Sequence, residues 1–175
     1  MTSNLSQFIK FLKEEISENQ IISANTIDII DPRDRLENKS EICVKPKNTQ
    51  EISKILKLAN KFTIPIIPIG GSTGLVGGQI ASQSNHVTLS LEKLDTINFF
   101  KKSNLLYVQS GAILSNIKKL AFNNGRLFPL SLASEGSCQI GGNLATNAGG
   151  LNVIKYGNVR DLCLGLEAVL PCGQI

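Results

Sequence analysis

The sequence is poor in the residue types on which many binding surfaces depend. Its 175 residues include no Trp, one Met, one His and two Tyr, and the 18 Lys and Arg exceed the 14 Asp and Glu by only four. The basic residues are scattered, and Tyr107 and Tyr156 lie far apart in the sequence. Because single-stranded nucleic acid is bound by basic grooves lined with stacking aromatic rings, we expect no nucleic-acid partner.

Metal-binding and secretory signals are also missing. The four cysteines (Cys43, Cys138, Cys163 and Cys172) include no C-x-x-C pair, and His86 is the single histidine. Structural zinc sites need closely spaced Cys and His ligands, so we expect no metal site. The cysteine count leaves disulfides open, but the first residues carry charges every few positions and resemble no secretory signal. We therefore expect reduced thiols and a cytoplasmic protein, with peripheral attachment to a membrane left open.

Long hydrophobic runs are absent too. The longest, residues 64–69, is far shorter than the roughly 20 apolar residues of a membrane-spanning helix and contains Pro65 and Pro68, so we expect no integral membrane segment. With 42% hydrophobic and 18% charged residues, the composition is that of a folded globular chain. The length suits one domain or part of a larger fold.

The pattern of apolar residues predicts alternating helices and strands. Residues 4–17 have helical spacing, which favours a helix packed on the core over one lying on a membrane surface. Asn48 and Glu51 are spaced as a capping box and open a helix that reaches Phe62. The other expected elements are strands at 41–45, 64–69, 87–91, 105–109 and 162–170, and a helix at 114–123 with Gly125 just beyond its end.

A glycine-rich loop, PIGGSTGLVGG at residues 68–78, directly follows one of these expected strands. Glycine permits positive φ and close backbone approach, so consecutive N–H groups can point into one concavity, where Ser72 and Thr73 add hydroxyl groups. Such a concavity suits an anion. The loop lacks the lysine of a P-loop and the glycine order of a Rossmann turn. A glycine-rich turn that binds nothing is the alternative.

A second stretch of small residues, GSCQIGGNLATNAGG, spans residues 136–150. Small side chains over this length cannot fill a core by volume, and a large flat cofactor would occupy the space that they leave. A flexible surface loop is the alternative, but Ile140, Leu144 and the absence of charge argue against a solvated one.

The sequence resembles the FAD-binding domain of the vanillyl-alcohol-oxidase type. The resemblance rests on the two glycine motifs together with LSLEKL at 89–94, KYGNVRD at 155–161 and LGLEAVLP at 164–171. Within that family the chain is similar to the FAD-linked D-2-hydroxy-acid dehydrogenases, which include the glycolate oxidase FAD subunit, D-lactate dehydrogenase and D-2-hydroxyglutarate dehydrogenase. The resemblance covers residues 40–175 in order and without large gaps. Ile113 departs from it by replacing a threonine that usually caps the following helix.

The resemblance implies an α+β fold. We expect a lead-in over residues 1–39 and an incomplete FAD-binding domain over 40–175. In this domain a small parallel strand-helix-strand subdomain (about 40–95) would pack on a mainly antiparallel one (about 96–175), with FAD in the cleft between them. Some relatives attach the flavin through a histidine in the first loop, where this chain has Ser72, so we expect non-covalent FAD.

The resemblance also implies which residues hold the cofactor. The FAD diphosphate would lie on the first loop, and the flavin with its ribityl chain would lie along the second stretch. The expected cofactor-binding residues are Gly70, Gly71, Ser72, Thr73, Gly74, Leu75 and Gly78 in the first loop, and Ser134, Ser137, Gly141, Gly142, Thr146, Asn147, Ala148 and Gly149 in the second stretch.

The implied activity is oxidation of a small 2-hydroxy acid of the glycolate, D-lactate or D-2-hydroxyglutarate class, with electrons passing to an external acceptor that the sequence does not identify. The family's substrate-binding arginine, metal cluster and cap domain follow the matched region, so we expect no catalytic residue in this chain. Pro171 and Gly173 signal a turn toward a partner strand, as if the chain stopped within a sheet. The alternatives are a remnant that only binds FAD, or half of a split enzyme completed by a separate C-terminal chain.

Overall fold

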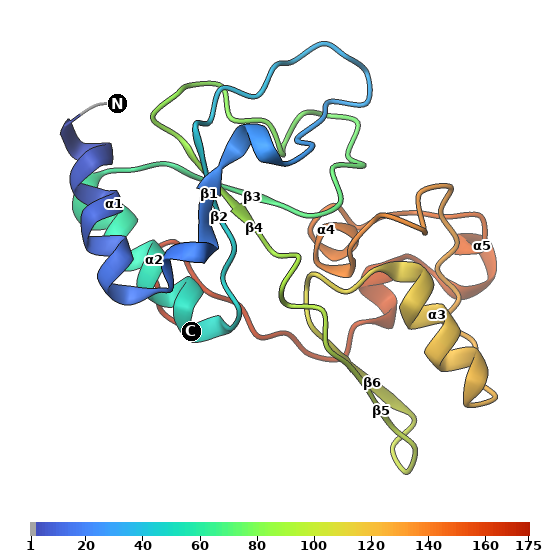
Figure 1. The fold of residues 1–175 in the computed structure, drawn as a ribbon. Coiled ribbons are helices and arrows are strands. Elements are labelled where there is room, and N and C mark those ends of the chain that lie inside the picture. Colours follow the sequence, from blue (N-terminus) through green and yellow to red (C-terminus); the bar gives the residue numbers. More distant parts are fainter. Residues whose placement is uncertain (1–2) are drawn as a thin grey trace. The chain divides into compact units, whose positions relative to one another are not determined.

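The computed structural model describes residues 3–175 and divides them into two compact units (Figure 1). The first unit holds the chain up to Lys93 together with Glu167–Ile175, and the second unit is Leu94–Leu166. Both units contain helices and strands, which confirms the expected α+β class.

The sheet of the first unit is mostly parallel. Its strands, in the order β1-β2-β4-β3, are Ile21–Ser23, Ile42–Val44, Val87–Ser90 and Ile66–Ile69. Strands β2 and β3 both run parallel to β4, while β1 is antiparallel to β2. The expected parallel strand-helix-strand arrangement is confirmed, and β1 is an additional edge strand that three residues were too few to predict.

Two long helices belong to this unit, α1 (Ser3–Glu15) and α2 (Thr49–Phe62). The Asn48 side chain caps α2 by accepting the Glu51 N–H at 2.9 Å. The Glu51 carboxylate accepts the N–H of Lys47 at 2.8 Å, one residue before the position that the capping box predicts. No helix of residues 3–175 is both long and apolar enough to cross a membrane.

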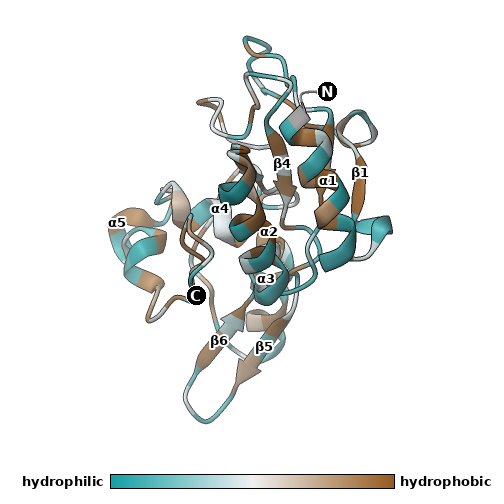
Figure 2. Cartoon of the chain, turned by 90° about the vertical axis from the view of Figure 1, so that its left-hand side faces the viewer, coloured by the Kyte–Doolittle hydropathy of each residue, from teal (hydrophilic) through white to brown (hydrophobic). Residues whose placement is uncertain are grey.

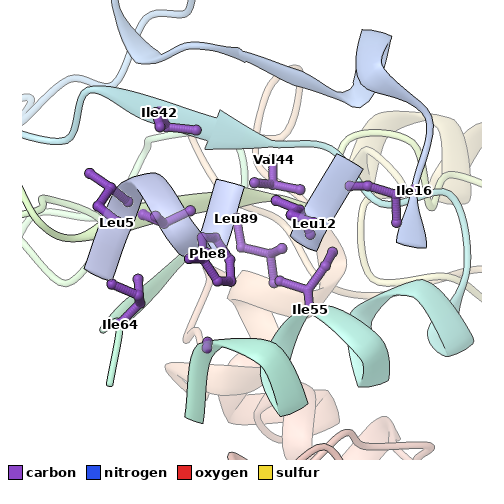
Figure 3. Packing of buried hydrophobic residues seen from close by; sticks show 11 residues of the cluster. Leu5, Phe8, Leu12, Ile16, Ile42, Val44, Ile55, Ile64 and Leu89 are labelled. Atoms are coloured by element: carbon purple, nitrogen blue, oxygen red, sulfur yellow. The ribbon is translucent and has the colours of Figure 1, made fainter. Parts of the chain in front are cut away.

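The core of the first unit fills the space between the sheet and the two helices. Figure 3 shows Leu5, Phe8 and Leu12 of α1 packed among Val44 and Leu89 of the sheet and residues of α2. Along α1, brown hydrophobic and teal hydrophilic segments alternate in Figure 2, as expected of a helix with one buried face. Burial of these apolar side chains holds α1 and α2 to the sheet.

The second unit has a hairpin and three helices. Strands β5 (Ile97–Phe100) and β6 (Leu105–Val108) are antiparallel, as expected for this part of the chain. The helices are α3 (Leu114–Asn123), α4 (Ile140–Ala145) and α5 (Val153–Tyr156). Short 3-10 turns occur at Glu18–Gln20 and Ala24–Thr26 in the first unit and at Val159–Leu162 in the second.

Helix α3 ends as the sequence predicts and begins without a side-chain cap. Gly125 adopts a φ of 67°, and its N–H bonds the carbonyl of Phe122 at 2.9 Å, while the N–H of Arg126 bonds that of Ala121 at 2.9 Å. This pair of bonds is the Schellman motif that glycine permits. At the other end Ile113 is the N-cap and makes no side-chain bond, in agreement with the loss of the usual threonine.

The prediction of a strand at residues 162–170 is wrong. The 3-10 turn Val159–Leu162 takes its first residue, and no strand follows up to Ile175. Apolar content suggested a strand, but a strand also needs a partner for its backbone, and none pairs with this stretch among residues 3–175. The last residues pack on α2 instead, where the Ser53 hydroxyl donates to the carbonyl of Gly173 at 2.5 Å and the Thr49 hydroxyl donates to Glu167 at 2.5 Å.

Replacing Phe8 by Ala should destabilise the first unit strongly. The ring is fully buried between α1, α2 and the sheet, so its removal leaves a cavity and should cost about 3–5 kcal/mol of unfolding free energy. Phe122, which is 80% exposed, provides the matched control, and Phe122→Ala should change stability by less than about 0.5 kcal/mol. Urea denaturation followed by circular dichroism measures both, and equal losses would contradict this packing.

Candidate cofactor-binding site

The glycine-rich loop begins where β3 leaves the sheet. Ile69, the last residue of β3, is buried, and the chain then turns out through residues 70–73, which are half-buried, to Gly74 and Leu75, which are exposed. Ser72 has a φ of 51° and Gly77 a φ of 78°. A glycine is needed at Gly77 because other residues rarely adopt this conformation.

The backbone N–H groups of this loop from residue 71 to residue 78 are free with respect to the described residues 3–175. Throughout the part of the chain that the structure describes, no backbone N–H of residues 71–78 donates a hydrogen bond. Backbone N–H groups in folded proteins are almost always paired, so a run of free ones is unusual. Consecutive free N–H groups on a turn form an anion-binding concavity, and the loop therefore fits a negatively charged group.

The carbonyl groups of the loop, by contrast, are bound from outside. The Gln79 Nε2 donates to the carbonyl of Gly74 at 2.9 Å and to that of Ile30 at 3.0 Å. The Arg35 Nη2 donates to the carbonyl of Leu75 at 2.8 Å. These bonds tie the loop to the turn at residues 30–36. In Figure 1 the turn is blue and the loop is green.

A buried carboxylate organises that turn. The Asp31 side chain has no exposed surface and accepts the N–H groups of Arg33, Arg35 and Leu36 at 3.2, 3.0 and 3.1 Å. Burial by itself would raise the pKa of Asp31, but these three N–H groups and the Arg35 guanidinium, 3.7 Å away, together lower that pKa below its usual value. Asp31 is therefore ionised at neutral pH and holds Arg35 in place.

The second stretch, around α4, is defined by close backbone packing. The N–H of Gly141 bonds the carbonyl of Ser110 at 2.8 Å, and a Cβ at position 141 would lie 2.7 Å from the Cβ of Ser110. A Cβ at Gly150 would lie 2.1 Å from the carbonyl oxygen of Ser131. Both glycines are thus required because another backbone passes directly over them.

Other predicted residues of this stretch form hydrogen bonds within the second unit. Asn147 has a φ of 48°, and its side-chain oxygen accepts the N–H of Arg160 at 3.2 Å. The hydroxyl of Thr146 donates to the carbonyl of Gly142 at 2.9 Å, and that of Ser137 to Ser134 at 3.4 Å. The N–H of Ala148 bonds the carbonyl of Asn143 at 2.8 Å.

Two glycines of this stretch lie at the surface. Gly142 is exposed, and a Cβ there would meet nothing within 4 Å. Gly149 is exposed as well, with an ordinary contact to the side chain of Asn158. The expected cofactor residues thus form two groups, with residues 70–78 in the first unit and residues 134–149 in the second.

Sequence reasoning missed several residues that shape these groups. Asp31, Arg35 and Gln79 carry no local signal, because nothing nearby in the sequence links residue 35 to a loop 40 residues away. In the second unit, Gln139 and Asn143 are buried, and their side-chain oxygens have no hydrogen-bond partner in the described chain. Both belong to the GSCQIGGN motif, which was the available signal.

The structure pairs none of the four cysteines in a disulfide. All four are free, and Cys43 lies fully buried in β2. Burial raises the pKa of the Cys43 thiol to about 11, against the opposing effect of the nearby Lys45 charge. The thiol is therefore protonated at neutral pH and acts as a packing group.

Comparison with known families identifies the domain. Residues 40–175 match the family model of the FAD binding domain. The chain belongs to this family. FAD is accordingly the cofactor of the domain, and the free amides of the glycine loop suit its diphosphate.

Curated relatives of this FAD-binding domain are dehydrogenases. The Arabidopsis thaliana D-2-hydroxyglutarate dehydrogenase is 35% identical over 97% of the chain and 31% of its own length. The zebrafish (Danio rerio) D-2-hydroxyglutarate dehydrogenase is 34% identical over 91% of the chain and 30% of its length. A Schizosaccharomyces pombe protein, provisionally named a D-lactate dehydrogenase, is 41% identical over 83% of the chain and 28% of its length. The chain thus spans less than a third of each relative.

Solved structures share the fold. An alkyldihydroxyacetonephosphate synthase superposes with a TM-score of 0.79 at 21% identity, covering 90% of this chain and 32% of that one. The glucose dehydrogenase Phl p 4.0202 superposes with a TM-score of 0.83 at 18% identity, covering 96% of this chain and 37% of that one. At these identities the likeness establishes the fold alone, and it confirms the vanillyl-alcohol-oxidase type of FAD-binding fold.

The expected cytoplasmic location is wrong by the same comparisons. The relatives from S. pombe, Arabidopsis and zebrafish are all named mitochondrial proteins. The expectation rested on unpaired cysteines and on the lack of a secretory signal. Neither feature identifies the compartment in which the protein works.

The neighbouring glycines of α4 should respond oppositely to alanine. Gly141→Ala places a Cβ against the backbone of Ser110 and should cost about 1–3 kcal/mol of stability or more. Gly142→Ala meets open space and should be neutral or stabilising by up to about 1 kcal/mol, because alanine favours a helix. Thermal unfolding of the two variants makes the comparison, and a stable Gly141→Ala protein would show that the close approach to Ser110 is incorrect.

Proposed function

We propose that this chain binds FAD without a covalent bond and forms the flavin-holding part of an oxidoreductase that acts on a 2-hydroxy acid. The observation that carries the proposal is the run of free N–H groups in residues 71–78, on a loop without a charged side chain. Oriented amides can neutralise a diphosphate without lysines, which agrees with the modest net charge of +4.

The proposed contacts follow the two groups of residues. Residues 70–75 and Gly78 would hold the diphosphate, and Ser134, Ser137, Gly141, Gly142 and residues 146–149 would line the flavin and its ribityl chain. In the second group, exposed Gly142 is the position most open to a cofactor, since the side chains of Thr146 and Asn147 bond within the protein. The single histidine, His86, lies outside the loop, which favours non-covalent attachment.

When bound, FAD supplies the chemistry of accepting two electrons from the substrate. The residues of this chain would bind the cofactor, orient it and shape its electrostatic surroundings. Relatives named as D-lactate and D-2-hydroxyglutarate dehydrogenases support a 2-hydroxy acid as the substrate class. Glycolate is a further member of that class, and it is supported only by the resemblance of the sequence motifs.

A second candidate is a flavin-binding chain that another chain completes. The relatives are more than three times as long as the matched region, and several large apolar side chains of the second unit are almost fully exposed. They are Leu151, Ile154, Leu164 and Leu166. In this version the lead-in (1–39) and the FAD-binding domain (40–175, with subdomains near 40–95 and 96–175) act with a separate C-terminal chain.

The substitution Gly71→Asp should abolish FAD binding. It places a side chain and a negative charge in the loop where the diphosphate is proposed to lie, so the two anions would repel each other. Gly165→Asp is the matched control, because Gly165 is exposed, has open space and lies outside both groups. Titration of FAD into each purified protein, followed by flavin fluorescence, measures the affinities. Equal binding by Gly71→Asp and Gly165→Asp would reject the proposed diphosphate site.

Turnover assays separate the two candidates. The purified 175-residue chain with added FAD should not reduce an artificial electron acceptor in the presence of D-lactate, glycolate or D-2-hydroxyglutarate, because no substrate-binding residue is proposed within it. Substrate-dependent reduction well above that of Gly71→Asp would show that the chain is a complete enzyme. Reduction that appears only on mixing with a separate C-terminal chain would support the second candidate.

A further inference from the structure

We propose that Arg35 and Gln79 are positioning residues that aim the backbone N–H groups of Leu75 and Val76 at the FAD diphosphate, an inference that rests on the proposed function. Neither side chain belongs to the expected cofactor site, and Val76 is absent from it as well. Gln79 donates to the carbonyl of Gly74, and Arg35 donates to the carbonyl of Leu75.

The planarity of the peptide group links each carbonyl to the next N–H. In a trans peptide the C=O of one residue and the N–H of the following residue point in opposite directions, and no cis peptide occurs among the described residues. The carbonyl of Gly74 points to Gln79, so the N–H of Leu75 points away from it. The carbonyl of Leu75 points to Arg35, so the N–H of Val76 points away from the turn at residues 30–36.

Both side chains are themselves fixed. Gln79 is buried, and its Nε2 also bonds the carbonyl of Ile30, so it has little freedom to turn. Arg35 lies beside the buried Asp31 carboxylate, which three backbone N–H groups hold. Two adjacent peptide groups of an exposed loop are thereby fastened to one turn of the same unit, and their N–H groups remain free for an anion.

A positioning role differs from simple charge attraction. The charge of Arg35 is largely balanced by the neighbouring carboxylate of Asp31, and the guanidinium donates to a carbonyl rather than standing free. Arg33 offers the comparison, because it lies two residues away on the same turn and is exposed. Its side chain makes no hydrogen bond or ion pair with any described residue. Replacing Arg33 or Arg35 by a neutral residue changes the net charge equally, but only the replacement of Arg35 removes the hydrogen bond to the carbonyl of Leu75.

The test compares the affinities of matched variants for FAD and for ADP, which carries a diphosphate without the flavin. Arg35→Gln should weaken both ligands about tenfold or more, by a similar factor, because the same N–H groups lose their orientation. Arg33→Gln should stay within about twofold of the unsubstituted chain. Gln79→Glu should also weaken both ligands, because a carboxylate cannot donate to the carbonyls of Gly74 and Ile30.

Substitutions at Val76 test the amide itself. The Val76 side chain is 82% exposed, and Val76→Ala and Val76→Pro both remove it, but only Val76→Pro also removes the N–H, so Val76→Pro should bind FAD about tenfold more weakly than Val76→Ala. Unfolding of each protein without ligand shows that the folded unit is intact, and a Val76→Pro protein that does not fold leaves the arginine pair as the deciding comparison.

The outcomes separate this inference from the proposed function. If Arg33→Gln and Arg35→Gln lose equal affinity for FAD and ADP, the arginines act through their charge and the positioning role is wrong. If Arg35→Gln keeps full affinity, Arg35 has no role in binding. In both cases FAD binding by the unsubstituted chain would leave the proposed function standing. An unsubstituted chain that binds neither FAD nor ADP would overturn both proposals.

Discussion

A loop that leaves its backbone N–H groups unpaired has to be held by something other than those groups. In this protein the holding bonds come from the side chains of Arg35 and Gln79, which donate to two loop carbonyls. Arg35 lies in a turn organised by the buried carboxylate of Asp31, and Gln79 also donates to the carbonyl of Ile30 at the start of that turn. The sheet contributes the starting point, because β3 is paired with β4 as far as Ile69 and releases the chain at Gly70. The free amides of the loop therefore depend on a buried charge some 40 residues earlier in the chain.

The two glycine-rich stretches use glycine for different physical reasons. In the first, the amides stay free, and Gly77 supplies a conformation with positive φ. In the second, Gly141 and Gly150 let backbone segments approach within distances that no Cβ allows, at Ser110 and Ser131. The first stretch is thus suited to meeting a charged group, whereas much of the second is a tightly packed scaffold with a few open positions such as Gly142.

The sequence allowed much of the framework to be predicted because the deciding signals were local. Asn48 and Glu51 marked the start of α2, and Gly125 marked the end of α3, since caps act within one turn of helix. The strand expected at 162–170 failed because a strand requires a partner that apolar content does not reveal. The bond from Arg35 to Leu75 was equally beyond local reasoning, since only the folded chain brings these two residues together.

Amide NMR of the 18.9 kDa chain can show whether the N–H groups of the glycine loop bind a diphosphate. Titration with ADP should shift the ¹H and ¹⁵N signals of residues 71–76 together, with one common dissociation constant, while the signals of Gly125 and Gly165, which lie outside both groups of proposed cofactor residues, stay in place. Shifts confined to other parts of the chain, or loop signals that move no more than those of the two glycines at saturating ADP, would show that the loop amides do not bind the diphosphate.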